Sequence, residues 1–467
     1  MQRISVVIPA YEMHGAGAAF LTESFERLAA QTFHDFEVVV SDNAETDVIK
    51  DVCDRYAGRL NIRRVQNTDP RRGMSSNLNN AIAHASGAIV KILFQDDFLY
   101  GDRALETISD NFDLDRDVWL ATACVHTEDG TEFFNTHRPR WHARMHAGKN
   151  TIGSPSVVAF KRGSGFTFDT NLKWLMDCEW YVRMHAAYGE PKCIRDATVA
   201  IRTGDHQTTR RVDKKLDLFE KNYAENAKNA IGREPLSLPS VTLVAVSGID
   251  PDGAQDAMIL SMIGVTYGAA VLVSHRPPRQ LDPRITFRQC LDTELSSTDP
   301  KNKDDYSRFM AYDLHKYIDT DFCLIVHNDA FVIHPESWLP EFLEYDYLGA
   351  PWPPGVHFSP DGTNIRVGNG GFSLRSKRML TMLNELNLPF TDGGTGFYNE
   401  DGIICVYYRT ELENAGMRFP SPELAARFAH EIDCPESSPN PFGFHNYKVT
   451  SRHAWIGKIM RRLKKLL

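Results

Sequence analysis

Short apolar, β-branched runs alternate along the chain with longer segments whose apolar residues recur at helical spacing. Residues 18–32 and 75–86 have the helical pattern. Buried-type strands are expected in the first half at ISVVI (4–8), EVVV (37–40), IVKILF (89–94) and VWLAT (118–122). This βαβ alternation predicts an α/β fold with a mostly parallel, doubly wound sheet of the Rossmann type.

The same alternation starts again after a polar, proline-containing connection at residues 202–240. The later strands are expected at VTLVAV (241–246), AAVLV (269–273) and FCLIV (322–326). We therefore expect two tandem α/β domains joined by a helical linker and followed by a tail. The expected boundaries are 1–205, 206–239, 240–450 and 451–467.

The tail at 451–467, SRHAWIGKIMRRLKKLL, contains six Lys or Arg residues and no acidic residue. Its apolar residues recur every three or four positions, so a helix there has one apolar and one basic face. Such a helix binds an anionic membrane surface; the alternative is a terminal helix docked on its own domain. We expect a cytoplasmic protein that is peripheral on the inner face of the cell membrane.

The bulk composition narrows the class of protein only a little. A net charge of −9 excludes a generally basic nucleic-acid-binding protein. The eight cysteines include no Cys-x-x-Cys pair, which favours a reducing compartment over a disulfide framework or a zinc site.

Polar residues follow three of the predicted strands in the first half. The first strand stops near Pro9, the second ends in Asp42-Asn43, and the third ends in Asp96-Asp97. The carboxyl ends of parallel strands meet at one edge of a sheet, where ligands bind. Carboxylates there suit Mg²⁺ or Mn²⁺, and Asp42 is able to accept an N–H group from a uracil-type base. For any one of these residues, the alternative is a turn or helix cap.

A further carboxylate, Asp177, lies in WLMDCEWYVRM (174–184), just before a Trp- and Tyr-rich helical pattern. A carboxylate is the group that takes a proton from an acceptor hydroxyl in an inverting sugar transfer. Asp177 is therefore the candidate general base.

The ordered set VVIPAYE, SDNAETD, NLNNAIAHASGAIVKILFQDDF and MDCEWYVRM resembles family 2 glycosyltransferases of the GT-A fold across residues 3–200. The resemblance implies a base at Asp177 and a metal and phosphate site at Asp96 and Asp97. Asp97 is the favoured metal ligand, because the motif is Gln-Asp-Asp and not Asp-x-Asp. Arg71 or Arg72 is expected to supply the charge of an arginine that the family often has just before the position of Asn77. The implied nucleotide site consists of Pro9, Tyr11, Glu12, Asp42 and Asn43.

The second half repeats the functional order of the first without visible residue identity. First strands begin at 4 and 241, acidic strand ends occur at Asp97 and Asp329, and later acidic residues occur at Asp177 and Asp401. This order predicts a second GT-A-like domain with a metal corner at Asp329.

Three further motifs carry candidate chemistry in the second half. VGNGGFSLRS (367–376) places Gly370 and Gly371 where backbone can approach a ligand, or where it makes a tight turn. Trp352 is expected to form a wall against a sugar face. His445 is expected to be a metal ligand beside Asp329, the alternative being a buried, hydrogen-bonded histidine.

Residues 241–447 resemble a domain of uncharacterised type found in bacterial sugar-transfer proteins, and the GNGGFSLRS…ED order resembles metal-dependent galactosyl- and related GT-A transferases. The resemblance implies that Gly370 and Gly371 line the donor and that Glu400 or Asp401 is the base or a sugar-hydroxyl anchor. His327 and Asn328 are expected to support the metal ligand or contact phosphate.

These expectations together predict a bifunctional transferase that moves sugars from nucleotide-diphosphate sugars to a lipid-linked or nascent surface glycan, such as an O-antigen or capsule. One alternative is a single active N-terminal domain with a C-terminal module that binds the acceptor glycan. A non-enzymatic sugar-binding scaffold is the other alternative, and it conflicts with the base, metal and nucleotide set of the first half.

Overall fold

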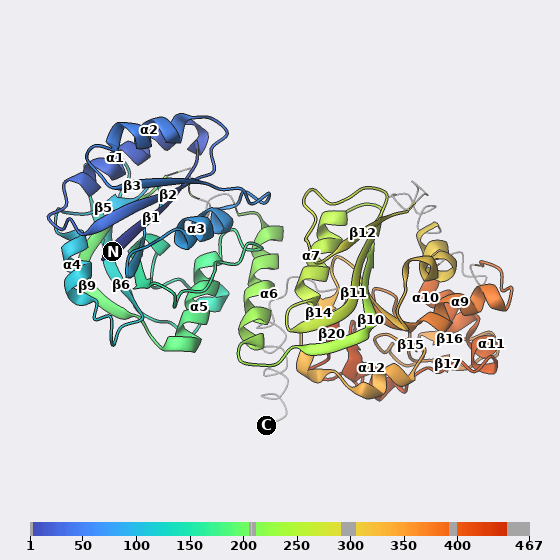
Figure 1. Cartoon of the computed structure of the whole chain (residues 1–467). Helices are drawn as coiled ribbons and strands as arrows, with labels where there is room; N and C mark the ends of the chain where they lie inside the picture. The colour runs from blue at the N-terminus through green and yellow to red at the C-terminus, as the bar shows by residue number, and fades with distance from the viewer. Residues whose placement is uncertain (1–2, 205–206, 208–211, 291–304, 392–398, 446–467) are drawn as a thin grey trace, which may run out of the picture. The chain divides into compact units, whose positions relative to one another are not determined.

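The structure is a computed structural model that describes residues 3–204, 207, 212–290, 305–391 and 399–445. The predicted membrane-binding tail at 451–467 lies outside the described residues. The chain divides into two compact units, Met1–Ile231 and Gly232–Leu467 (Figure 1).

The first unit contains each strand and helix predicted for it, within a few residues. Its helices are α1 (Gly17–Ala29), α2 (Val48–Tyr56), α3 (Met74–Ala83), α4 (Ala104–Asn111), α5 (Met176–Tyr188) and α6 (Lys214–Ala230). Its strands are β1 (Ile4–Ala10), β2 (Phe36–Asp42), β3 (Ile62–Gln66), β4 (Ile89–Ile92), β5 (Phe98–Leu99), β6 (Trp119–Thr127), β7 (Phe134–His137), β8 (Val158–Lys161) and β9 (Lys192–Arg202). β1 and β2 are buried along their whole length, which is why they read as continuous apolar runs.

The strands of the first unit form one mixed sheet among the described residues, in the order β3-β2-β1-β4-β8-β6-β9-β5, with β7 on β6. The expectation of a mostly parallel sheet is corrected here. β8 runs antiparallel to β4 and β6, and β5 runs antiparallel to β9. Figure 1 shows α1 and α2 beside each other along one side of the strands and α3 along the other, as right-handed crossovers require.

Helix α6, which falls in the segment expected to link the domains, packs on the first unit through a buried carboxylate. Glu220 is fully buried and accepts hydrogen bonds from the backbone N–H groups of residues 173, 174 and 175, at 2.7, 3.0 and 2.7 Å. These groups lie at the amino end of α5, where a helix leaves N–H groups without intrahelical partners and favours negative charge. Glu220 therefore holds the start of the helix that carries Asp177.

The second unit also contains an α/β core with a mixed sheet. Its strands are β10 (Leu236–Val246), β11 (Val265–Ser274), β12 (Thr286–Gln289), β13 (Phe322–Val326), β14 (Phe331–Val332), β15 (Tyr347–Leu348), β16 (His357–Phe358), β17 (Asn364–Ile365), β18 (Phe372–Ser376), β19 (Ala429–His430) and β20 (Gly443–Phe444). Its helices include α7 (Pro251–Ser261), α9 (Lys377–Glu385), α10 (Glu400–Gly402), α11 (Arg409–Asn414) and α12 (Pro422–Phe428). Caps start two of them: Asp250 accepts from the N–H of Gly253 in α7, and Ser376 from that of Met379 in α9.

The two units share one order of strands. The main sheet of the second unit runs β12-β11-β10-β13-β18-β15 in the described part of the chain, with β18 antiparallel to β13. In each unit the first four core strands therefore lie in the order third-second-first-fourth, followed by an antiparallel strand. A short strand after the fourth core strand pairs with a later strand in both units: β5 with β9, and β14 with β20.

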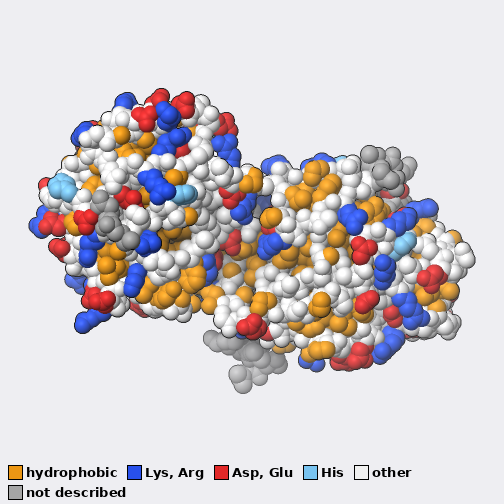
Figure 2. Space-filling model, in the orientation of Figure 1, with side chains coloured by type: hydrophobic (Ala, Val, Ile, Leu, Met, Phe, Trp, Pro, Cys, Tyr) orange, Lys and Arg blue, Asp and Glu red, His pale blue; other side chains and the backbone are white. Residues whose placement is uncertain are grey.

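The surface and the cysteines agree with the composition. On the face shown in Figure 2, acidic and basic side chains are interspersed over both units. All eight cysteines are free of disulfides. No helix among the described residues is long and apolar enough to cross a membrane.

We predict that Glu220→Ala destabilises the first unit by about 3 kcal/mol, because backbone N–H groups at the start of α5 lose their buried acceptor. Urea unfolding followed by tryptophan fluorescence measures the change. Asp217→Ala on the same helix is the control, since its pair with Lys221 is partly exposed and an exposed pair contributes under about 1 kcal/mol. Equal effects of the two changes would contradict the role given to Glu220.

Candidate functional site

The predicted nucleotide-binding residues of the first unit lie at one edge of its sheet. Parallel pairing sets Ala10 beside Asp42 and Val7 beside Ile92, so the loops after β1, β2 and β4 are neighbours. Pro9 itself is buried within β1.

Gln95 fixes the loop that follows β1. This side chain is 2% exposed; its Oε1 accepts from the Tyr11 N–H at 2.9 Å, and its Nε2 donates to the carbonyls of Tyr11 and Gly17 at 3.0 and 2.8 Å. A Cβ atom on Gly17 would lie 2.2 Å from the Tyr11 carbonyl oxygen, so this approach requires glycine. The glutamine that departs from the Asp-x-Asp pattern therefore positions Tyr11, a role that the motif did not predict.

Carboxylates tie the loops after β1 and β2 together. Glu12 Oε1 accepts from the backbone N–H groups of Glu45 and Thr46, at 2.5 and 3.0 Å. Asp42 is 1% exposed, and its two oxygens accept from the Ala44 N–H at 2.8 Å and from Arg64 Nε at 2.7 Å. Arg64 was not among the predicted residues.

The arginines that precede α3 have different surroundings. Arg72 donates to the carbonyl of Asn43 at 3.2 Å, and Asn43 Nδ2 donates to the carbonyl of Arg72 at 2.7 Å. Arg71 is exposed and pairs with Asp69 at 2.8 Å. Arg72 is thus joined directly to the predicted nucleotide residues.

The two aspartates after β4 differ in access. Asp97 is 3% exposed, and its oxygens accept from the Arg202 N–H at 3.0 Å and from Ser154 Oγ at 3.4 Å. Burial, reinforced by the charge of Asp96, raises the pKa of Asp97 to about 8. Asp96 is only half-buried, and its carbonyl accepts from Arg202 Nε at 3.3 Å. Arg202, which sequence reasoning missed, therefore holds both residues in place.

Asp177 lies in the first turn of α5 and is oriented by the loop at 150–154. Asn150 Nδ2 donates to Asp177 Oδ2 at 2.7 Å, and the Cys178 N–H donates to Asp177 Oδ1 at 2.6 Å. Burial raises the pKa of Asp177 to about 6, against the effect of these hydrogen bonds. Because Ser154 of the same loop contacts Asp97, one loop connects the predicted base to the predicted metal corner.

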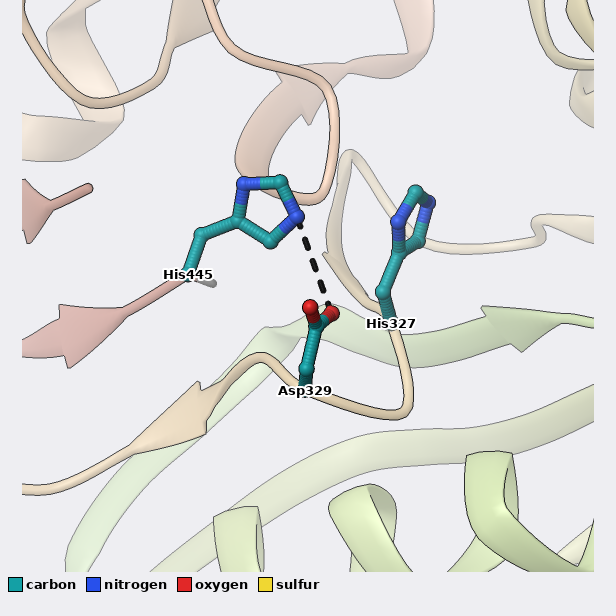
Figure 3. Close-up of side chains that lie close together, drawn as sticks. All are labelled: His327, Asp329 and His445. Carbon is teal, nitrogen blue, oxygen red and sulfur yellow. Dashed lines mark ion pairs between the residues drawn. The ribbon is translucent and has the colours of Figure 1, made fainter. Parts of the chain in front are cut away.

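The second unit brings His327, Asp329 and His445 together (Figure 3). The ligand atoms of these side chains lie within 4.8 Å of one another, and His445 Nε2 is 3.7 Å from Asp329 Oδ1. Burial lowers the pKa of His327 to about 4. Burial opposes a charge on His445, but the carboxylates of Glu431, Asp329 and Asp401 together outweigh that effect and raise the pKa of His445. His327 joins the two predicted ligands, although the sequence placed it only in support.

Asp401 and Glu400 lie at the start of α10, beside a buried arginine. Asp401 accepts from the N–H groups of Gly370 and Gly402, at 3.1 and 2.8 Å. Burial, together with the charge of Glu400, raises the pKa of Asp401 to about 7. Arg375 is fully buried and donates to Glu400 Oε1 at 3.1 Å, while its Nη1 has no hydrogen-bond partner among the described residues.

The glycine-rich segment accommodates protein side chains. A Cβ atom added to Gly368 would lie 1.8 Å from the Trp352 ring, and one added to Gly370 would lie 1.8 Å from Glu400. A Cβ atom added to Gly371 would lie 2.2 Å from the His445 ring. Trp352 is 7% exposed, and its ring lies 4.2 Å from that of His357. The glycines thus let the candidate site residues approach the start of β18.

Comparison with known families separates the two units. Residues 5–174 match the family described as Glycosyl transferase family 2, and residues 293–445 match the family described as Protein of unknown function (DUF5672). The first unit therefore contains a glycosyltransferase domain of family 2, as its motifs predicted. The likeness of the second unit to a sugar-transfer domain stays a prediction.

Curated relatives match part of the first unit. Glycosyltransferase GlyG of Streptococcus pneumoniae is 26% identical over 132 residues, which are 28% of this chain and 42% of that protein. Poly(ribitol-phosphate) beta-N-acetylglucosaminyltransferase TarS of Staphylococcus aureus is 31% identical over 101 residues, which are 21% of this chain and 17% of that protein. The chain thus spans less than half the length of these relatives.

Two solved structures match part of this chain with low TM-scores. The structure of S. aureus TarS 1-349 with UDP-GlcNAc has a TM-score of 0.38 and 16% identity, covering 56% of this chain and 71% of that chain. The mannosyltransferase PcManGT from Pyrobaculum calidifontis, in complex with GDP-Man and Mn²⁺, has a TM-score of 0.37 and 23% identity, covering 48% and 63%.

We predict that Arg375→Met destabilises the second unit by about 3–5 kcal/mol, because it leaves the buried Glu400 carboxylate without its partner. The double change Arg375→Met/Glu400→Gln is expected to recover part of that loss, since the unpaired charge is gone. Urea unfolding of the full-length variants measures both values. A double variant no more stable than Arg375→Met would show that the ion pair is not the cause.

Proposed function

We propose that the chain is a bifunctional glycosyltransferase in which each unit uses one nucleotide-diphosphate sugar and the first unit inverts the anomeric centre. The observation that carries the first activity is the placement of Asp177. Its carboxylate is oriented by Asn150, its raised pKa suits proton uptake near neutral pH, and one loop connects it to Asp97.

In the first unit the donor is proposed to lie along the edge formed by the loops after β1, β2 and β4. Tyr11, positioned by Gln95, and the loop after Asp42 form the nucleotide end. Their backbone is already fixed by Gln95 and Glu12, so little ordering is needed when the donor binds.

A divalent ion, Mg²⁺ or Mn²⁺, neutralises the donor diphosphate when it is bound, and carboxylate oxygens fit such an ion. Sequence reasoning favoured Asp97 as the ligand. The half-buried Asp96 is the better choice, because the Asp97 oxygens accept hydrogen bonds inside the protein. Asp97 is then a positioning residue that keeps Asp96 at the sheet edge.

The transfer step follows from this arrangement. The acceptor hydroxyl oxygen attacks the anomeric carbon, the bond from that carbon to the diphosphate oxygen breaks, and the nucleoside diphosphate leaves with its electron pair. Asp177 takes the hydroxyl proton. Attack from the side opposite the leaving group inverts the configuration.

The second activity is proposed from the strand order that both units share and from Asp401. This carboxylate, whose pKa burial raises to about 7, lies beside Gly370 and is the proposed base or sugar-hydroxyl anchor, with Glu400 held by Arg375. If the second unit only binds the acceptor glycan, Asp401 has no role in any linkage.

The acceptor is proposed to be anionic, as a lipid-linked or phosphate-containing glycan is. A groove of about 880 Å³ is lined by Arg138, Arg140 and Arg195 together with one acidic residue, Asp196. These arginines are exposed and make no ion pair among the described residues. The backbone N–H of Arg140 donates to the Thr151 carbonyl at 3.0 Å, and Thr151 Oγ1 donates to the Arg140 carbonyl at 2.7 Å. Thr151 follows Asn150, the residue that orients Asp177. TarS, the relative named above, acts on a poly(ribitol-phosphate), which is an anionic polymer.

We predict that Asp177→Asn and Asp401→Asn each remove a different linkage, by about 10²-fold or more in kcat, because each change removes one proton acceptor. Product linkages formed from a panel of nucleotide sugars, analysed by NMR, measure the effect. Nucleotide-sugar binding should persist in both variants. If both variants still form both linkages, the assigned roles are wrong, and if only Asp177→Asn affects transfer, the second unit is a binding module.

The pH profile provides an independent check on Asp177. Only the ionised carboxylate accepts a proton, so the rate of the first transfer is expected to fall as pH drops through about 6. A rate that stays constant from pH 7 to below 5 would contradict the assignment.

We predict that Arg138→Gln/Arg140→Gln raises KM for a phosphate-bearing acceptor about tenfold and leaves KM for a neutral glycoside unchanged, because only the anion gains from these charges. Initial rates with the two acceptors at low and high salt measure this, and the effect should shrink at high salt. Arg116→Gln, which alters an exposed arginine paired with Asp113, is the matched control. Equal changes with both acceptors would contradict an anionic acceptor.

A further inference from the structure

We propose that His327, Asp329 and His445 form a centre for a divalent first-row transition ion, of the class Mn²⁺, Fe²⁺, Co²⁺ or Zn²⁺, that discriminates against Mg²⁺. This centre would be part of the proposed donor site of the second unit. The role of the ion rests on the proposed second transferase activity, whereas the binding of the ion does not.

The spacing of the three side chains fits one ion. Two ligand atoms that are each about 2.1 Å from an ion lie roughly 3–4 Å apart. His445 Nε2 and Asp329 Oδ1 are 3.7 Å apart, and all three ligand atoms lie within 4.8 Å of one another. The two imidazole rings, 5.6 Å apart and inclined by 83°, lie with Asp329 between them in Figure 3.

The fold delivers these residues from separate segments. His327 follows β13, the fourth core strand of the second unit. A small three-stranded sheet in the order β14-β20-β19 supplies the rest: Asp329 precedes β14, and His445 follows β20. Phe331 pairs with Phe444 across this sheet, and this register brings Asp329 and His445 to the same end.

Neighbouring groups orient both rings. His445 Nδ1 lies 2.9 Å from Asn369 Nδ2 and 3.1 Å from Glu431 Oε1, and these contacts hold the ring with Nε2 facing Asp329. Tyr306 Oη lies 2.7 Å from His327 Nε2, which leaves Nδ1 as the ligand nitrogen. Carboxylate and hydroxyl partners of this kind fix the ring and tautomer of metal-binding histidines.

The donor set selects the class of ion. Imidazole nitrogen suits transition ions, whereas Mg²⁺ requires oxygen ligands and retains its waters. In the first unit, Asp96 offers only oxygen. The two units are therefore expected to differ in metal preference. Three protein ligands also leave coordination positions open, which the diphosphate oxygens of a donor would fill.

Gly371 allows this arrangement. A Cβ atom at this position would lie 2.2 Å from His445 Nε2, so Gly371→Ala is expected to displace the ring without removing a ligand. The carbonyl of Gly371 also accepts a hydrogen bond from the His327 N–H at 3.0 Å. Gly371 therefore lies against both histidines of the cluster.

The test is metal binding by the full-length protein in the absence of any donor. Chelator-treated protein is dialysed against Co²⁺ with a large molar excess of Mg²⁺, and bound metals are counted by mass spectrometry. The visible absorption of bound Co²⁺ reports nitrogen ligation. We expect Co²⁺ to be retained by the wild type and lost from His327→Gln, Asp329→Asn, His445→Gln and Gly371→Ala. Glu431→Gln is expected to weaken Co²⁺ binding by about 10- to 100-fold.

Matched variants separate loss of ligation from loss of structure. His334→Gln changes a buried histidine of the same segment that lies outside the cluster, and Asp96→Asn changes the proposed ion site of the first unit. Both should retain Co²⁺, and thermal unfolding identifies any variant that fails to fold. His327→Asp, which replaces nitrogen by oxygen, is expected to reduce the preference for Co²⁺ over Mg²⁺ at least tenfold.

Displacement of Co²⁺ by Mg²⁺ at comparable concentrations would overturn the inference, as would normal Co²⁺ binding by folded His327→Gln. Loss of the bound ion from Asp96→Asn would also overturn it. Co²⁺ binding with these ligand dependences but without transfer by the second unit would support the centre and reject only the proposed second activity. Sugar transfer by a second unit that binds no transition ion would support the second activity and reject the metal centre.

Discussion

A guanidinium group buried in each unit needs compensation inside the protein, and an acidic side chain provides it: Glu23 in the first unit and Glu400 in the second. Removing a charge from water is costly unless it is paired and hydrogen-bonded. Arg202, 6% exposed, donates to the Asp96 carbonyl and pairs with Glu23, and its N–H binds Asp97. Arg375, fully buried, pairs with Glu400. Satisfying these charges fixes the loops that carry the chemistry before any ligand binds.

The two units share a strand order, but different residues occupy the equivalent corner of the sheet in each unit. In each unit, a short strand after the fourth core strand pairs with a later strand: β5 with β9, and β14 with β20. The residue at the end of β9, or just after β20, faces an aspartate. In the first unit that residue is Arg202, whose backbone N–H binds Asp97. In the second it is His445, whose ring faces Asp329. A backbone N–H occupies one oxygen of the carboxylate, whereas an imidazole nitrogen adds a candidate metal ligand beside it.

Positioning of the proposed base in the first unit depends on elements distant in the sequence. Glu220 on α6 holds the backbone at the start of α5, and Asn150 orients the Asp177 carboxylate. The loop that contains Asn150 also carries Ser154, which contacts Asp97. Base and donor corner are therefore parts of one hydrogen-bonded structure, in which a proton acceptor keeps its place relative to the reacting centre.

The sequence by itself determined the most buried strands, namely β1, β2, β4, β6, β10, β11 and β13, because buried strands read as apolar runs whatever surrounds them. It also placed Asp96, Asp177, Asp329 and Asp401 at element ends, since carboxylates are excluded from those runs. The tertiary structure alone decided which polar groups act together. Gln95 binds Tyr11 across 84 positions and Arg202 binds Asp97 across 105, and no local pattern encodes such partners. Burial likewise distinguished Asp96 from Asp97, and the pairing of β14 with β20 joined Asp329 to His445, because both depend on contacts that exist only after the chain has folded.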